Sequence, residues 1–152
     1  MNKQFKKIFF GSLAVIATCV AITGCGPKEK ENKIPENIEL VHTAEDGTKV
    51  NKSDKINNET KKLGDLEFKN ISITETGERT KIEFDVYNSS DEMLNEKELQ
   101  VILLNTQNEE IKRIKPVYIG TIPPKGIGKG KTETTLDYTE VYDIKFIEQE
   151  NI

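Results

Sequence analysis

Residues 81–88 read KIEFDVYN and decide the fold prediction, because charged and apolar side chains alternate one by one from Lys81 to Val86. A period of two is typical of a β-strand with one face buried and the other in water. Residues 99–104 (LQVILL) repeat the alternation, but Ile102 and Leu104 make that segment apolar on both faces, which predicts a central strand. A third alternation, at residues 142–146 (YDIKF), predicts another strand near the C-terminus.

Further strand patterns are weaker but regularly spaced. They cover residues 66–74, 111–115, 117–122 and 131–136, and turn residues fall between strands at 76–78, 88–91, 105–109 and 123–126. In the first of these the apolar phase slips, so we expect a bulge or break near Asn70. About seven short strands without a long helical period predict an all-β fold, an antiparallel β-sandwich. We expect its aromatic residues to fill the core: Phe68, Phe84, Tyr87, Tyr118, Tyr142 and Phe146.

The N-terminal segment carries a different pattern. Lys3, Lys6 and Lys7 precede an apolar run at residues 8–22, which is short enough for a signal peptide. The run ends Ile-Thr-Gly-Cys at Cys25 and resembles the lipobox of bacterial lipoproteins. The resemblance implies diacylglyceryl transfer to the Cys25 thiol, cleavage before Cys25 and acylation by palmitate-like chains. The alternative is an uncleaved N-terminal anchor with Cys25 as a bystander.

A lipid on Cys25 would determine where the protein resides. Two acyl chains, at ~0.8 kcal/mol per buried methylene group, anchor a protein to the membrane stably. The resemblance therefore implies a cell-membrane protein, lipid-anchored on the extracytoplasmic face, as in a Gram-positive bacterium. Removal of residues 1–24 takes away three lysines, so 22 basic against 26 acidic residues become 19 against 26, a net charge of −7. An acidic chain is not expected to bind nucleic acid.

Residues 25–62 are predicted to be a charged tether between this signal peptide (1–24) and the sandwich (63–152). Residues 26–62 contain eight lysines and eight acidic residues in 37 positions, with few apolar residues. Other interpretations of the second half stay open: Ser53 could cap a short helix, residues 38–41 could add an edge strand, and the domain could start as early as Val50.

The domain also resembles the small Ig-like domains of Gram-positive surface lipoproteins, of the FxLYD type and related families. The resemblance rests on residues 84–90 (FDVYNSS), 99–105 (LQVILLN) and 122–126 (IPPKG), and it extends over about residues 66–148. Leu104-Asn105 stands where these families have an aromatic-acidic pair, and Lys125 interrupts their Pro-Gly turn. The resemblance implies an Ig-like sandwich and no catalytic residues.

Residues with catalytic or metal-binding chemistry are scarce. His42 lies in the predicted tether, Cys19 lies in the signal peptide and the Cys25 thiol would be blocked by lipid, so the domain offers no histidine-based or thiol-based site. Residues 126–132 (GIGKGKT) resemble a phosphate loop, but Lys125 replaces the first glycine and a β-like segment follows, which favours a glycine-rich hairpin or bulge. We expect no enzymatic activity and no cofactor.

Acidic residues are the remaining site candidates. They are Asp137, Glu140 and Asp143 near the last strand, and Asp91 and Glu92 in a turn. Carboxylates on neighbouring loops can bind Ca²⁺, but no EF-hand spacing is present, and we expect no metal site. Two functions remain: a non-catalytic binding or interaction module for an envelope or host protein or a glycan, and a structural accessory or assembly factor of an envelope complex.

Overall fold

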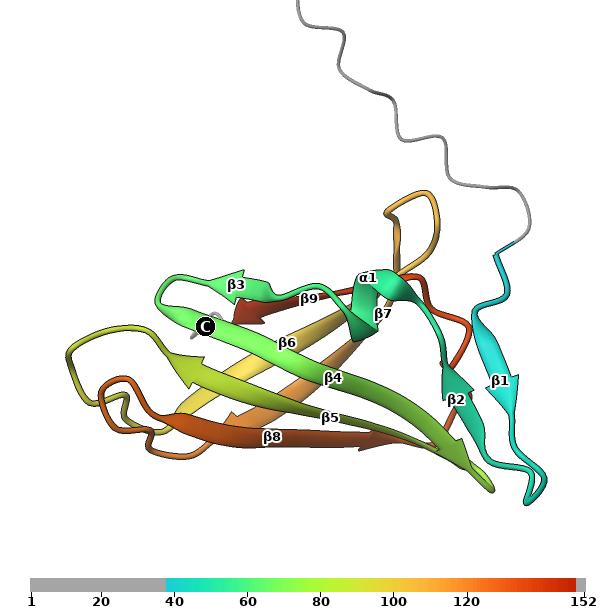
Figure 1. Ribbon diagram of the computed structural model, residues 1–152, viewed down its shortest axis with the longest axis horizontal. Helices are drawn as coiled ribbons and strands as arrows, with labels where there is room; N and C mark the ends of the chain where they lie inside the picture. The colour runs from blue at the N-terminus through green and yellow to red at the C-terminus, as the bar shows by residue number, and fades with distance from the viewer. Residues whose placement is uncertain (1–37, 150–152) are drawn as a thin grey trace, which may run out of the picture. The chain divides into compact units, whose positions relative to one another are not determined.

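The computed structural model describes residues 38–149, which fold as nine strands and one short helix (Figure 1). The elements are β1 (Val41–Thr43), β2 (Lys49–Asn51), α1 (Asp54–Asn57), β3 (Lys61–Leu63), β4 (Leu66–Thr76), β5 (Arg79–Asn88), β6 (Lys97–Leu104), β7 (Glu110–Ile119), β8 (Ile127–Thr134) and β9 (Asp143–Glu148). The all-β prediction is confirmed. No helix within residues 38–149 is long and apolar enough to cross a bilayer.

The strands form two antiparallel sheets. The larger sheet has the order β1-β2-β4-β5-β8. Strand β3 also pairs with β4, near the start of that strand, whereas β2 pairs near its end. The smaller sheet has the order β7-β6-β9. The predicted central position of residues 99–104 is confirmed, because β6 pairs with a strand on each side and its last six residues are all buried. The architecture is the predicted β-sandwich.

Three phenylalanines join the two sheets. Phe68 of β4 stacks on Phe146 of β9 with ring centroids 3.8 Å apart, and Phe84 of β5 meets both rings edge-on, at 5.7 and 4.8 Å. Such edge-on contacts add stability beyond the buried area. The prediction for the tyrosines was wrong: Tyr118 is 63% exposed, and Tyr87 and Tyr142 are only half-buried.

The predicted irregularity at Asn70 is confirmed. The β4–β5 register shifts between Lys69 and Ser72, and Asn70 has a φ of 50°, in the left-handed region that asparagine tolerates. Helix α1 lies against β4 and β9 and inserts Ile56, which is fully buried, into the core. The segment that precedes the predicted domain therefore contributes to the core.

The predicted boundary between tether and sandwich at residue 63 is consequently wrong. Strands β1 and β2 form a hairpin, β2 and β3 pair with β4, and the edge strand begins at Val41. The helix follows Ser53 as expected, although the Ser53 hydroxyl donates to the Tyr142 carbonyl instead of capping it. The segment was not predicted to fold because it has few apolar residues, but hydrogen bonds of polar side chains attach much of it to the rest of the domain. Residues 1–37, with the signal peptide and Cys25, lie outside the described residues.

A buried asparagine fixes the start of the domain. Asn51 is 1% exposed, and its amide nitrogen donates to the carbonyls of Thr139 and Val141 at 2.6 and 2.8 Å. Its side-chain oxygen accepts the backbone N–H of Ser53 at 2.9 Å. Together with the Ser53–Tyr142 bond, these contacts form a clasp between residues 51–53 and residues 139–142. Buried amides normally satisfy their hydrogen bonds in this way.

The glycine-rich segment is a strand, not the predicted hairpin or bulge. Residues 127–134 form β8 and pair with β5 residue by residue. A Cβ at Gly130 would overlap the ring of Phe84, and one at Gly128 would lie 2.7 Å from Cδ1 of Ile122. Glycine therefore stands at both positions because core side chains occupy the space beneath them.

Candidate functional site

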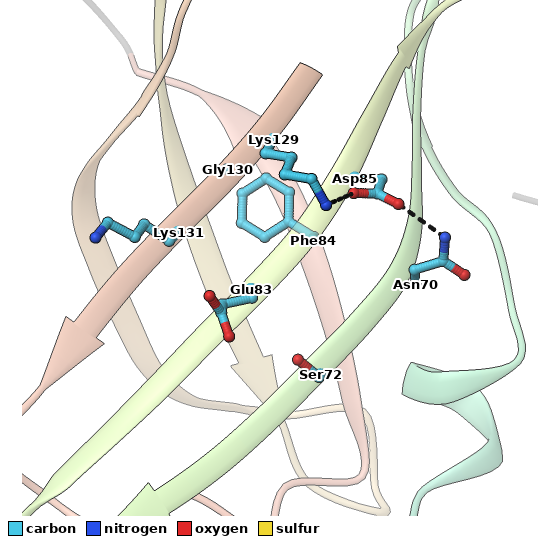
Figure 2. Close-up of a pocket in the computed structure, with 8 residues that line it drawn as sticks. All are labelled: Asn70, Ser72, Glu83, Phe84, Asp85, Lys129, Gly130 and Lys131. Carbon is cyan, nitrogen blue, oxygen red and sulfur yellow. Dashed lines mark hydrogen bonds and ion pairs between the residues drawn. The ribbon is translucent and has the colours of Figure 1, made fainter. Parts of the chain in front are cut away.

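The outer face of the larger sheet carries a shallow depression of about 520 Å³ where β4, β5 and β8 run side by side (Figure 2). Its lining residues are Asn70, Ser72, Glu83, Phe84, Asp85, Lys129, Gly130 and Lys131. The period of two that buries Phe84 turns its neighbours outward, so the carboxylates of β5 face the solvent.

The register between β5 and β8 arranges these charges. In the strand register Glu83 lies opposite Lys131 and Asp85 lies opposite Lys129, with Phe84 opposite Gly130 between them. Directly opposite residues project from the same face of a sheet, so two acidic and two basic side chains surround the depression. Phe84 and Gly130 face the opposite, inner side of the sheet, so the strand backbone at these two positions forms the floor between the charges.

One side of the depression is an internally bonded network. Asp85 accepts a hydrogen bond from the amide of Asn70 at 2.8 Å and forms an ion pair with Lys129 at 3.1 Å, as the dashed lines in Figure 2 show. The Asn70 bond first, and the Lys129 ammonium second, hold the pKa of Asp85 below its ordinary value. The left-handed backbone at Asn70 is what brings its amide to this carboxylate.

The other side is less occupied. Glu83 pairs with Lys81 of its own strand at 2.7 Å, and Lys131 makes no ion pair among residues 38–149. Figure 2 shows the Lys131 side chain pointing away from Lys129, and Glu83 lies near Ser72 of β4. This side therefore presents an ammonium group, a carboxylate and a hydroxyl to solvent.

The depression presents hydrogen-bonding groups and charges of both signs to solvent. Its lining includes no histidine and no cysteine. Sequence reasoning did not single out this site, although the two alternations of charge, at residues 83–85 and 129–131, were visible. What the sequence did not provide was the register that places them opposite each other.

The acidic candidates from the sequence do not come together. Asp137 pairs with Lys49, Asp143 with Lys61 at 2.6 Å, and Asp91 with Lys125 at 3.1 Å. Burial would raise the pKa of Asp137, but its bonds to Lys49 and Thr139 outweigh that effect and lower it. Among residues 38–149, no group of three or more His, Cys, Asp or Glu residues is arranged to hold a metal ion. His42 is exposed on β1, and Cys25 lies outside the described range.

Comparisons with known proteins are sparse. No family model matches the chain, and no curated protein matches it. Among solved structures, a DUF1425 family member from Shewanella sp. pv-4 is similar over 74% of this chain and 96% of that chain, with 5% sequence identity and a TM-score of 0.39.

Proposed function

We propose that the chain is a membrane-anchored extracytoplasmic lipoprotein whose β-sandwich is a non-catalytic binding module. The observation that carries the binding role is the depression on the larger sheet, where Glu83, Ser72 and Lys131 offer polar groups of both charges around a floor of strand backbone. A shallow polar surface of this kind fits a ligand rich in hydroxyl and amide groups, such as an envelope glycan.

The anchor is supported by the order of the N-terminal features: three lysines, a short apolar run, and Cys25 after two small residues. With β1 beginning at Val41, 15 residues (26–40) separate Cys25 from the sheet, so the reach from the membrane is at most roughly 50 Å. A domain on such a short connection would meet partners close to the bilayer.

Anchoring is tested by changing Cys25 to Ala. The variant is expected to lose palmitate incorporation and to keep its signal peptide or leave the membrane fraction. A variant that still incorporates labelled palmitate and stays in the membrane would refute the lipoprotein assignment.

Binding is tested by co-sedimentation with purified cell-wall glycan. We expect the Glu83→Gln/Lys131→Ala variant to lose most of the bound fraction. Lys145→Ala removes an exposed lysine from the smaller sheet and is the matched control, which should bind like the parent chain. Equal binding by all three proteins, or none by the parent, would contradict a glycan site in the depression.

One observation favours a second candidate, a structural accessory of an envelope complex. Many charged side chains on the larger sheet pair with one another: Lys62 and Lys69 with Glu67, Lys81 with Glu83, Lys129 with Asp85, and Arg79 with Glu133. A surface neutralised in this way suits a spacer without a diffusible ligand. Proximity labelling in intact cells separates the two, because an accessory should label one stoichiometric complex and ignore substitutions at Lys131.

A further inference from the structure

Strand β8 has a free edge. It pairs with β5 on one side, and although β7 of the smaller sheet lies near it, no strand within residues 38–149 forms a ladder with its other side. Figure 1 shows β8 along the border of the larger sheet. A row of unpaired backbone N–H and C=O groups can receive another strand.

The other sheet edges are poorer acceptors. Strand β1 has only three residues, and β9 lies beside β3, with an ion pair between Lys61 and Asp143. Strand β7 contains Pro116, which lacks an N–H, and two register shifts interrupt its pairing with β6. Strand β8 is eight residues long, has no proline and keeps an unbroken register with β5.

The charges on the outer face of β8 favour one register with a second copy of the same strand. An antiparallel pair centred on Thr132 sets Lys131 opposite Glu133 of the second copy, twice by symmetry. Centring on Lys131 sets Lys129 opposite Glu133 twice but also sets Lys131 against itself, and centring on Gly130 sets Lys129 against Lys131 twice. Of these registers, only the one centred on Thr132 has attractive pairs without a repulsive one. Opposite charges across strands stabilise a pair and like charges destabilise it.

We propose that two copies of this chain associate through β8, joined about a two-fold axis at Thr132 into one continuous sheet. The inner face of β8 carries only Gly128, Gly130, Thr132 and Thr134, so bulky side chains do not meet there. Lys131 makes no ion pair among the described residues, and Glu133 pairs with Arg79 only at the surface, with both side chains well exposed. Such an exposed pair is weak and can be exchanged.

The lysines on β8 give the association selectivity. Lysine on an edge strand discourages unrelated strands from pairing, since most would leave its charge unmatched. A second copy brings the matching carboxylate of Glu133. The inference rests on no step of the proposed function, because neither the lipid nor a glycan takes part in it.

A cysteine on the proposed axis tests the pairing in the full chain. In Thr132→Cys the two thiols of a dimer face each other across adjacent strands, at a Cα separation that a disulfide can span. Mild oxidation of the full-length protein should yield a reducible dimer. The parent chain measures the background from Cys19 and Cys25, and Lys145→Cys, on the smaller sheet, controls for random collision.

Charge exchange tests the register. In the Thr132→Cys chain, Lys131→Glu and Glu133→Lys should each reduce the dimer roughly tenfold, because two attractive pairs become repulsive. The double exchange Lys131→Glu/Glu133→Lys should restore it. All three are exposed substitutions, and equal resistance to protease shows that the fold is kept. A dimer no stronger than the controls, or one that ignores the charge exchange, would overturn the inference.

Discussion

Replacing Asn51 with Ala tests whether residues 41–63 are part of the fold. The side chain joins β2 to residues 139–141 through two buried hydrogen bonds and accepts a third from the N–H of Ser53, and alanine can make none of them. If this segment were the predicted tether, the change would leave stability untouched. Because the structure places Asn51 in the interior, we expect a large loss.

The size of the loss follows from the bonds removed. Each contributes a net ~0.5–1.5 kcal/mol, and the carbonyls of Thr139 and Val141 and the N–H of Ser53 would lose their partner in a buried place. The sum is about 2–4 kcal/mol, a large part of the ~5–15 kcal/mol that stabilises a domain. Asn51→Asp should cost more, because a carboxylate oxygen would face two carbonyl oxygens.

Urea unfolding of a chain that begins at Gly26 measures this directly. With a slope of ~1.5 kcal/mol per molar, the midpoint should fall by roughly 1–3 M. Asn58→Ala is the control, since the Asn58 side chain makes one exposed hydrogen bond, to the Asp54 carboxylate at 2.8 Å, and its loss should shift the midpoint little. Equal midpoints for Asn51→Ala and Asn58→Ala would refute the interpretation that the clasp holds the N-terminal segment.

Three other predictions concern the core, pH and calcium. Gly130→Ala should destabilise the domain by about 1–3 kcal/mol through overlap with Phe84, and in a Phe84→Leu background the added cost should shrink in a double-mutant cycle. The pKa values of Asp85 and Asp137 are lowered in the folded protein, so their contribution to stability is complete above the ordinary carboxyl pKa of 3.8 and is lost as the pH falls below that value. The urea midpoint should therefore fall on acidification below pH 3.8. This fall should be smaller in Asp85→Asn, which lacks one of the two carboxylates. Millimolar Ca²⁺ should leave the melting temperature unchanged, because Asp137 and Asp143 already pair with lysines; a rise of several degrees would contradict this.

The features that were predictable from sequence are those encoded by local alternation. The sequence Glu83-Phe84-Asp85 indicates which face of β5 is buried. Strand β6 is apolar on both faces, which indicates its position in the centre of a sheet. The slip of apolar phase around Asn70 likewise marks a real bulge. Each pattern is contained in one strand, so no knowledge of a partner strand is needed.

The features that were missed depend on residues far apart in the chain. Asn51 looks like one more polar residue in a charged stretch until residues 139–141, about 90 positions later, provide its acceptors. Gly130 looks like a turn residue until Phe84 is placed beneath it. The depression has the same origin, since its charges oppose one another only through the β5–β8 register. Composition and period cannot reveal a register.

The clasp also determines how the domain would respond to its proposed anchor. A lipid on Cys25 would pull on the chain where it enters β1, and β2 pairs with β4 through only two residues, Lys49 and Val50. Such a short ladder is a weak attachment, but the next residue is Asn51, whose buried bonds tie the chain to residues 139–141. A pull from the membrane side would therefore reach the body of the sandwich through this asparagine. Hydrogen bonds in the interior suit that role better than the exposed ion pair between Lys49 and Asp137, which solvent and salt would weaken.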